Sequence, residues 1–127
     1  MNPSPSGPRQ RLGRWGENLA ATHLEAAGYT ILARNWRCAE GEIDLVARDG
    51  TTIVIVEVKT RRGRRYGAPE EALTPRKAQQ LLNLGARYIY EQGLEDANWR
   101  IDLVAVELDE RGTFLRCDHI PNAVLGW

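Results

Sequence analysis

The chain has few of the side chains on which many enzyme chemistries depend. Its 127 residues include two cysteines, Cys38 and Cys117, which are far apart in the chain, and two histidines. A zinc site is therefore not expected, and both cysteines should be reduced thiols. The only serines are Ser4 and Ser6 near the N-terminus, which argues against a serine nucleophile. Glycine patterns that cradle nucleotide phosphates after a strand are also missing.

Long apolar runs are missing too. No stretch is long enough to span a bilayer, and the N-terminus lacks the apolar core of a signal peptide. We therefore expect a cytoplasmic protein with no membrane partner. Hydrophobic residues make up 43% of the chain and charged residues 27%, as in a globular domain with one core. The composition predicts a disordered N-terminal tail over residues 1–11 and a single domain over residues 12–127.

The formal net charge is +0, so no overall field draws the protein towards nucleic acid. The basic residues are nevertheless unusual, because only Lys59 and Lys77 among the 17 are lysines, a bias that also fits a GC-rich genome. Arginines gather just after Lys59, where their forks could bind phosphate oxygens. A solvated loop is the alternative. We predict nucleic-acid contacts at Arg61, Arg62, Arg64, Arg65, Tyr66 and Lys77.

Hydrophobic periodicity and turn residues predict the order of elements. We expect a helix over 12–27, strands over 29–36, 43–48 and 51–60, a helix over 75–91, and strands over 99–108 and 113–118. Gly28 should stop the first helix, and Thr74 with Pro75 should begin the second. The order αβββαβ(β) predicts an α/β fold in which a mixed β-sheet is flanked by helices.

Helical spacing also predicts which side chains are buried. In the first helix the expected buried face is Trp15, Leu19, Thr22, His23 and Ala26, with His23 in the core rather than acting as a general base. In the second helix it is Ala78, Leu81, Leu82, Ala86 and Ile89. Trp36 is expected to pack in the core, and Asp102 to be a structural or supporting acid.

Charged residues interrupt a predicted β-hairpin that is otherwise apolar. The strand from Ile53 to Val58 is apolar and β-branched except for Glu57, and Lys59 follows directly. An unpaired carboxylate in such a strand is costly, so charges there usually do chemistry or bind a compensating group. An ion pair or a solvated sheet edge is the structural alternative, and an isolated Glu-x-Lys triplet is common by chance.

The turn of this hairpin decides which side chains meet. If residues 49–50, Asp-Gly, form the two-residue turn, the numbers of cross-strand partners sum to 99. Asp44 and Glu57 then become diagonal neighbours on one face of the sheet, which they share with Glu42 and Lys59. A shift of the pairing by one residue would separate them.

Two carboxylates held this way suit a hard divalent cation. Mg²⁺ (or Mn²⁺) prefers oxygen ligands and keeps several waters, so Asp44 and Glu57 are the expected metal ligands. The carbonyl of Val58 could be a further ligand. Lys59 could hold an attacking water or neutralise charge that grows on a phosphate.

The same motifs resemble a known group of proteins. Asp44 followed by Glu57-Val58-Lys59 resembles the PD-(D/E)xK signature of restriction-endonuclease-like nucleases, although the Pro-Asp dipeptide is absent. More closely, the chain is similar to the YraN-like family of small predicted endonucleases. The resemblance runs from about residue 13 to 122 and rests on motifs in order: Gly16-Glu17, Gly28-Tyr29, Asn35-Trp36-Arg37, Gly41-Glu42-Ile43-Asp44-Leu45-Val46 and Glu57-Val58-Lys59-Thr60-Arg61.

This resemblance implies a restriction-endonuclease-like fold and adds Glu17 as a third acid for catalysis and metal binding. From its position alone, Glu17 could equally be a glutamate near a helix start, favoured by the helix dipole. Glu42 is an accessory candidate that could also be an edge carboxylate. For Gln79 and Gln80 a solvated helical face is the expected environment.

The expected function is a metal-dependent phosphodiesterase, a DNA endonuclease on branched or damaged DNA similar to Holliday-junction resolvases. Its catalytic residues would be Asp44, Glu57, Lys59 and Glu17. A homodimer is the expected assembly, because cutting two strands usually needs two sites. The rival hypothesis is a non-catalytic nucleic-acid-binding module that retains the nuclease fold and binds DNA in a salt-sensitive way through its arginines.

Overall fold

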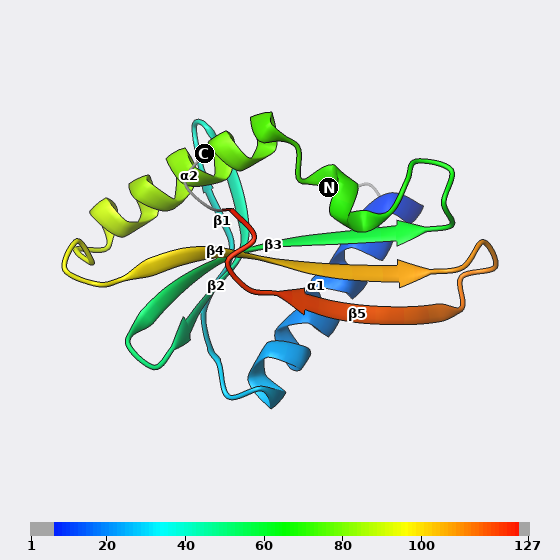
Figure 1. Cartoon of the computed structure of the whole chain (residues 1–127), viewed down its shortest axis with the longest axis horizontal. Helices are drawn as coiled ribbons and strands as arrows, with labels where there is room; N and C mark the ends of the chain where they lie inside the picture. The colour runs from blue at the N-terminus through cyan, green and yellow to red at the C-terminus, as the bar shows by residue number, and fades with distance from the viewer. Residues whose placement is uncertain (1–6, 125–127) are drawn as a thin grey trace, which may run out of the picture.

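The computed structural model describes residues 7–124, which form a mixed sheet with a helix on each face (Figure 1). The elements are α1 (Pro8–Ala26), β1 (Thr30–Cys38), β2 (Gly41–Asp49), β3 (Thr52–Arg62), the short 3-10 helix η1 (Pro69–Ala72), α2 (Pro75–Glu91), β4 (Trp99–Leu108) and β5 (Phe114–Ile120). The α/β class and the order of elements expected from the sequence are confirmed.

The five strands lie in the order in which they occur in the chain, from β1 to β5. Neighbouring strands are antiparallel except β3 and β4, which run parallel because α2 carries the chain back between them. β3 is therefore an inner strand, bonded to β2 over its first half and to β4 from Ile53 to Arg62. The end of β3, where Glu57 and Lys59 lie, is held mainly by β4.

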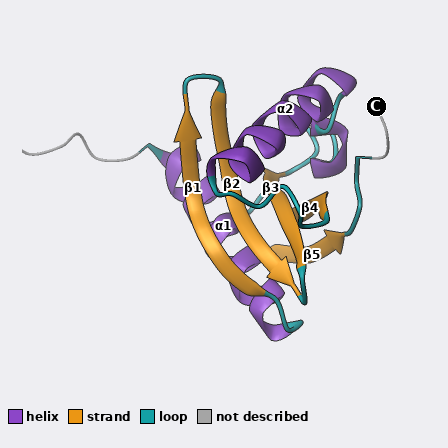
Figure 2. Ribbon diagram, turned by 90° about the vertical axis from the view of Figure 1, so that its left-hand side faces the viewer, coloured by secondary structure: helices purple, strands orange, loops and turns teal. Residues whose placement is uncertain are grey.

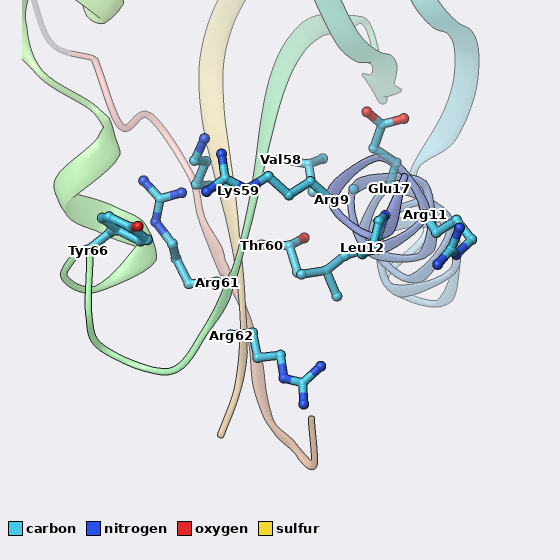
Figure 3. A pocket seen from close by; sticks show the side chains of 12 residues that line it. Arg9, Arg11, Leu12, Glu17, Val58, Lys59, Thr60, Arg61, Arg62 and Tyr66 are labelled. Carbon is cyan, nitrogen blue, oxygen red and sulfur yellow. The ribbon is translucent and has the colours of Figure 1, made fainter. Parts of the chain in front are cut away.

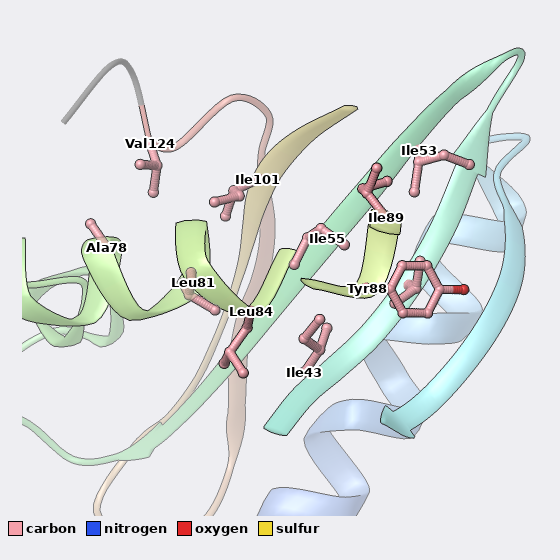
Figure 4. Close-up of a cluster of buried hydrophobic side chains, with 11 residues drawn as sticks. Ile43, Ile53, Ile55, Ala78, Leu81, Leu84, Tyr88, Ile89, Ile101 and Val124 are labelled. Atoms are coloured by element: carbon pink, nitrogen blue, oxygen red, sulfur yellow. The ribbon is translucent and has the colours of Figure 1, made fainter. Parts of the chain in front are cut away.

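Helix α2 covers one face of the sheet through a cluster of apolar side chains (Figure 4). Thr74 begins the helix as expected, because its hydroxyl accepts a hydrogen bond from the Lys77 backbone N–H at 3.2 Å. The prediction of the buried face was partly wrong. Leu82 is only half-buried and Ala86 is exposed, whereas the residues that pack on the sheet are Ala78, Leu81, Leu84, Gly85, Tyr88 and Ile89.

Helix α1 covers the opposite face, behind the sheet in Figure 2. The face predicted for this helix was wrong: Trp15, Thr22, His23 and Ala26 are exposed, and only Leu19 of that set is half-buried. His23 is therefore not a core residue. The helix instead turns its small residues to the sheet, and its buried side chains are Gly16, Ala20, Ala21 and Leu24.

The close approach of α1 to β3 explains this choice of face. A Cβ at residue 16 would overlap the Thr60 hydroxyl, so the helix backbone can lie this near only because residue 16 is glycine. Large side chains such as Trp15 would hold the helix away from the sheet and are turned outwards. Periodicity alone favoured the large residues and missed this constraint.

Replacing Gly16 by alanine should destabilise the fold by about 1–2 kcal/mol, because the clash with Thr60 outweighs the gain in helix propensity. Thermal or urea unfolding of the purified variant measures this change. Gly13→Ala is the matched control, since nothing lies within 4 Å of a Cβ there, and it should be neutral or stabilising. A Gly16 variant as stable as the Gly13 variant would contradict the proposed close contact.

The remaining boundaries differ modestly from the predictions. α1 begins at Pro8, so residues 8–11 of the expected tail are helical, while residues 1–6 lie outside the described part. Gly28 follows the helix with φ +95°, as expected of a stop. β5 runs to Ile120, past the predicted end at residue 118. Trp36 packs edge-to-face on Tyr88, with ring centroids 5.4 Å apart, which confirms its place in the core.

Asp102 is fully buried and is structural, as the sequence suggested. Its carboxylate accepts hydrogen bonds from Arg100 Nε at 3.0 Å and from the backbone N–H of Asn122 at 2.9 Å, and contacts His119 Nε2 at 2.7 Å. A buried acid with these partners fixes the β4–β5 pair.

Within residues 7–124 neither helix has the length and apolar character needed to traverse a lipid bilayer.

Candidate active site at the parting of two strands

The candidate site lies where β2 and β3 stop pairing. Their ladder runs from Asp49–Thr52 near the turn to Leu45–Val56 and ends there. Directly beyond it, Asp44 Oδ2 accepts a hydrogen bond from the Val58 backbone N–H at 2.8 Å. A carboxylate thus takes the place of a strand partner, which keeps the freed N–H satisfied and fixes Asp44 against β3.

The turn lies one residue later in the chain than predicted. The sum of the numbers of paired residues therefore differs by two. Asp49 pairs with Thr52, so partners sum to 101 rather than 99, and the two turn residues are 50–51. Only Gly50 has a positive φ, +61°, as a type II′ turn requires, whereas the predicted type needs two such residues. A shift by two keeps each side chain on its face. Extended past the ladder, this register sets Asp44 opposite Glu57 rather than diagonal to it.

Asp44 and Glu57 form a tightly interacting pair. Burial, the hydrogen bond to Glu57 and the negative charge of Glu57 together raise the pKa of Asp44 to about 9, against the effect of the Val58 N–H. Glu17 contributes a smaller effect in the same direction. With the pKa of Asp44 raised this far, its protonated carboxyl is favoured at neutral pH and hydrogen-bonds to Glu57.

A lysine from α2 supplies the positive charge next to this pair. Lys77 Nζ lies 3.1 Å from Glu57 Oε2, and the Glu57 side chain is only 12% exposed. Lys77 was expected to contact phosphate, but the structure places it on Glu57. It compensates one negative charge where two acids meet, and the proton on Asp44 compensates the other.

Lys59 lies two residues after Glu57 on the same strand, so both project from the same side of the sheet. The side chains of Val58 and Thr60 point the other way, towards α1, while Arg61 points towards Tyr66 (Figure 3). Lys59 is half-buried and lines a basic groove. The structure therefore places Lys59 beside the acid pair and next to a surface that suits phosphates.

This basic groove has a volume of about 980 Å³ and lies between the first half of α1 and the end of β3. It is lined by α1 residues between Pro8 and Glu17, by Val58 to Arg62, and by Tyr66. Arg9 and Arg11 contribute to it from α1, and neither was predicted as a site residue because both fall in the expected tail over residues 1–11. The alternation of arginine with helix-compatible residues before Leu12 was the signal that could have found them.

The predicted nucleic-acid residues divide into two groups. Arg61, Arg62 and Tyr66 line the basic groove, and Tyr66 is 65% exposed. Arg65 lies over the Tyr66 ring, 5.6 Å from its centroid. Arg64, in contrast, forms an ion pair with the buried Glu107, which lowers the pKa of Glu107, so its role includes holding β4.

Glu17 and Glu42 lie on the β1 side of the acid pair. Both line a second groove of about 400 Å³, together with Asn35 and Arg37. Glu42 is 3.6 Å from Arg37 Nε and pairs with Arg37 across β1–β2. Extended past the ladder, the β2–β3 register sets Glu42 opposite Lys59. Glu17 receives a hydrogen bond from Asn35, a contact that the sequence did not reveal.

Gln79 and Gln80 of α2 have partners other than the acid pair. Gln79 bonds to Asn83 on an exposed helical face, as expected. Gln80 Nε2 donates to the Glu40 carbonyl at 3.3 Å and so ties α2 to the β1–β2 turn. Neither contributes to the candidate site.

The oxygen donors of Asp44 and Glu57 fit a divalent cation. Asp44 and Glu57 offer carboxylate oxygens at one point, and their mutual repulsion is met in the protein by a proton and Lys77. Within residues 7–124 no three histidine, cysteine or acidic side chains converge on one point, so Glu17 does not join the pair closely. Two carboxylates fit Mg²⁺, which commonly binds one or two and completes its shell with water and phosphate oxygens.

Comparison with known proteins places the chain in a family. The model of the uncharacterised protein family UPF0102 matches residues 16–106. A UPF0102 protein of Nocardioides sp. is 47% identical over 112 residues, which cover 88% of this chain and 90% of that protein. A UPF0102 protein of Roseiflexus castenholzii is 46% identical over 120 residues, covering 94% and 97% of the two chains. The chain therefore belongs to the uncharacterised family UPF0102, which confirms the YraN-like resemblance seen in its motifs.

Proposed function

We propose that this protein is a metal-dependent phosphodiesterase that cleaves DNA, an endonuclease acting on branched or damaged DNA. The observation that carries the proposal is the Asp44–Glu57 pair at the parting of β2 and β3, beside a groove lined with arginines. A structural ion pair would not need two carboxylates in contact. A cation and a phosphate would satisfy both the acids and the arginines.

In the proposed reaction a water oxygen bonds to phosphorus while the bond from phosphorus to one sugar oxygen breaks. The attacking water loses a proton, and the leaving sugar oxygen gains one. Asp44 and Glu57 would hold Mg²⁺ or Mn²⁺, which when bound supplies electrostatic polarisation of the phosphate. Lys59 would orient the water or neutralise the phosphate oxygens, and Arg61 and Arg62 would bind the flanking backbone.

A non-catalytic DNA-binding module is the second candidate. The lack of a three-acid cluster in residues 7–124 and the engagement of Glu57 by Lys77 favour it. Both functions predict salt-sensitive binding to DNA through the basic groove. They differ in whether a phosphodiester bond is cut.

A panel of labelled single-stranded, duplex, flap and four-way-junction DNA tests the proposal. We expect cleavage of at least one branched substrate with Mg²⁺ or Mn²⁺ and none with EDTA. Asp44→Ala, purified in parallel, controls for contaminating nucleases. Binding of DNA without cleavage of any substrate in either metal would favour the module. Sedimentation of the protein with and without a junction would test the proposed homodimer.

A further inference from the structure

Asn35 has a backbone conformation that few residues adopt. Within residues 7–124 only Asn35 and Asn122 have positive φ without being glycine, and φ is +51° at Asn35. Asparagine is the side chain that best tolerates this left-handed region, although it remains less favourable than extended backbone. A strained residue inside a strand must therefore be maintained by its surroundings.

This conformation interrupts the alternation of β1. Ala33 and Trp36 are three residues apart, yet both pack on the α2 side of the sheet. Asn35, between them, is turned towards α1. Its Nδ2 donates a hydrogen bond to Glu17 Oε2 at 3.0 Å, and next to it Arg34 bonds to Asn18 at 2.9 Å.

Asn35 also lies opposite Asp44. On either side of it Arg34 pairs with Leu45 and Trp36 with Ile43, so the register sets Asn35 against Asp44. One residue of β1 thus connects the acid on α1 with the acid pair between β2 and β3. Glu17 lines both grooves, and Asn35 lines the second one.

We propose that Asn35 is a positioning residue, which holds Glu17 so that its carboxylate supports a cation bound by Asp44 and Glu57. This inference rests on the proposed metal-dependent function. The amide binds one carboxylate oxygen and leaves the other for a water bound to the cation. It adds no charge, so it does not compete with a cation for Glu17 as Lys77 does for Glu57.

The chain offers a matched pair of variants for the test. Asn35→Gly keeps the positive φ and removes the amide, and Asn122→Gly makes the same change at φ +55°, at a residue that lines neither groove. Mn²⁺ binding is measured by electron paramagnetic resonance, and cleavage is followed over a range of Mg²⁺ concentrations. Both variants should melt within about 3 °C of wild type, which shows that they fold.

We expect Asn35→Gly to weaken Mn²⁺ binding about tenfold and to raise the half-maximal Mg²⁺ concentration similarly, with less effect on the rate at saturating metal. Asn122→Gly should match wild type. In the double variant Asn35→Gly/Glu17→Gln the losses should not add, because Asn35 acts through Glu17. A folded Asn35→Gly with wild-type Mn²⁺ affinity, or losses that add fully, would overturn the inference alone. A wild type that neither binds Mn²⁺ nor cuts DNA would overturn the proposed function and this inference with it.

Discussion

Replacing Lys59 by methionine should lower the rate of DNA cleavage by at least about 10³-fold while Mn²⁺ still binds. Lys59 projects from the same side of β3 as Glu57 and lines the basic groove, so its ammonium group can act on phosphate or water. It is not a metal ligand. Single-turnover cleavage and Mn²⁺ titration of the same preparation separate the two effects. Lys59→Arg should not restore the rate, because a planar guanidinium does not replace a compact ammonium.

The second lysine provides a contrast within the same chain. Lys77→Met removes the cation that now pairs with Glu57, so metal should bind equally well or more tightly. Arg76→Met, on the exposed side of α2, is the matched control and should behave as wild type. Undiminished cleavage by Lys59→Met would exclude the proposed role of Lys59, and loss of metal binding in that variant would show that Lys59 shapes the metal site instead.

Replacing Asp44 by asparagine should stabilise the metal-free protein while abolishing metal binding. The asparagine oxygen can still accept the Val58 N–H, and its amide can donate to Glu57, so what is lost is the ability of this side chain to ionise. In EDTA at pH 7.5 we expect the melting temperature to rise by at least about 5 °C. Sites for charged ligands are commonly built at the expense of stability, and this pair of acids would be one of them.

The raised pKa of Asp44 also predicts how the difference in stability between Asp44→Asn and wild type changes with pH. In the fold the pKa of Asp44 lies at about 9, against 3.8 for the unfolded chain, so below pH 3.8 the carboxyl is protonated in both states. As pH rises from about 4 to about 9, the unfolded chain loses this proton first, and wild-type stability falls by at most about 1.4 kcal/mol per pH unit. The difference between Asp44→Asn and wild type should therefore widen with pH.

Scanning calorimetry at pH 4, 6 and 8 in EDTA measures this difference. Asp96→Asn changes an exposed acid in the same way and should match wild type at each pH. An Asp44→Asn variant that melts below wild type at pH 8 would mean that the carboxylate stabilises the fold, which is incompatible with a buried repulsive pair.

The acid pair could be predicted from sequence because alternate residues of a strand share one face of the sheet, so a change of register by an even number of residues keeps every side chain on its face. The turn was misassigned, since a glycine at the first turn position allowed Asp49 to stay in the strand. The resulting shift of two residues preserved the faces, so Asp44 and Glu57 still meet. A shift of one would have lost them.

Other parts of the site depend on packing that no local pattern encodes. The partner of Glu57 comes from α2, 20 positions along the chain, and its choice follows from how that helix sits on the sheet. The contact of Asn35 with Glu17 requires a break in the alternation of side chains along β1, whereas a prediction from periodicity takes the alternation to be regular. The face of α1 was misjudged because large apolar residues outweighed small ones in the pattern.

The contact between Gly16 and Thr60 has a consequence for the neighbouring position. Residue 16 sets how deep α1 sits above β3, and Glu17 follows it directly on the helix. A side chain at 16 would raise the helix by roughly the thickness of the added group and draw Glu17 away from Asn35. The reach of an acidic side chain into the cleft is therefore determined by the absence of a side chain one residue earlier.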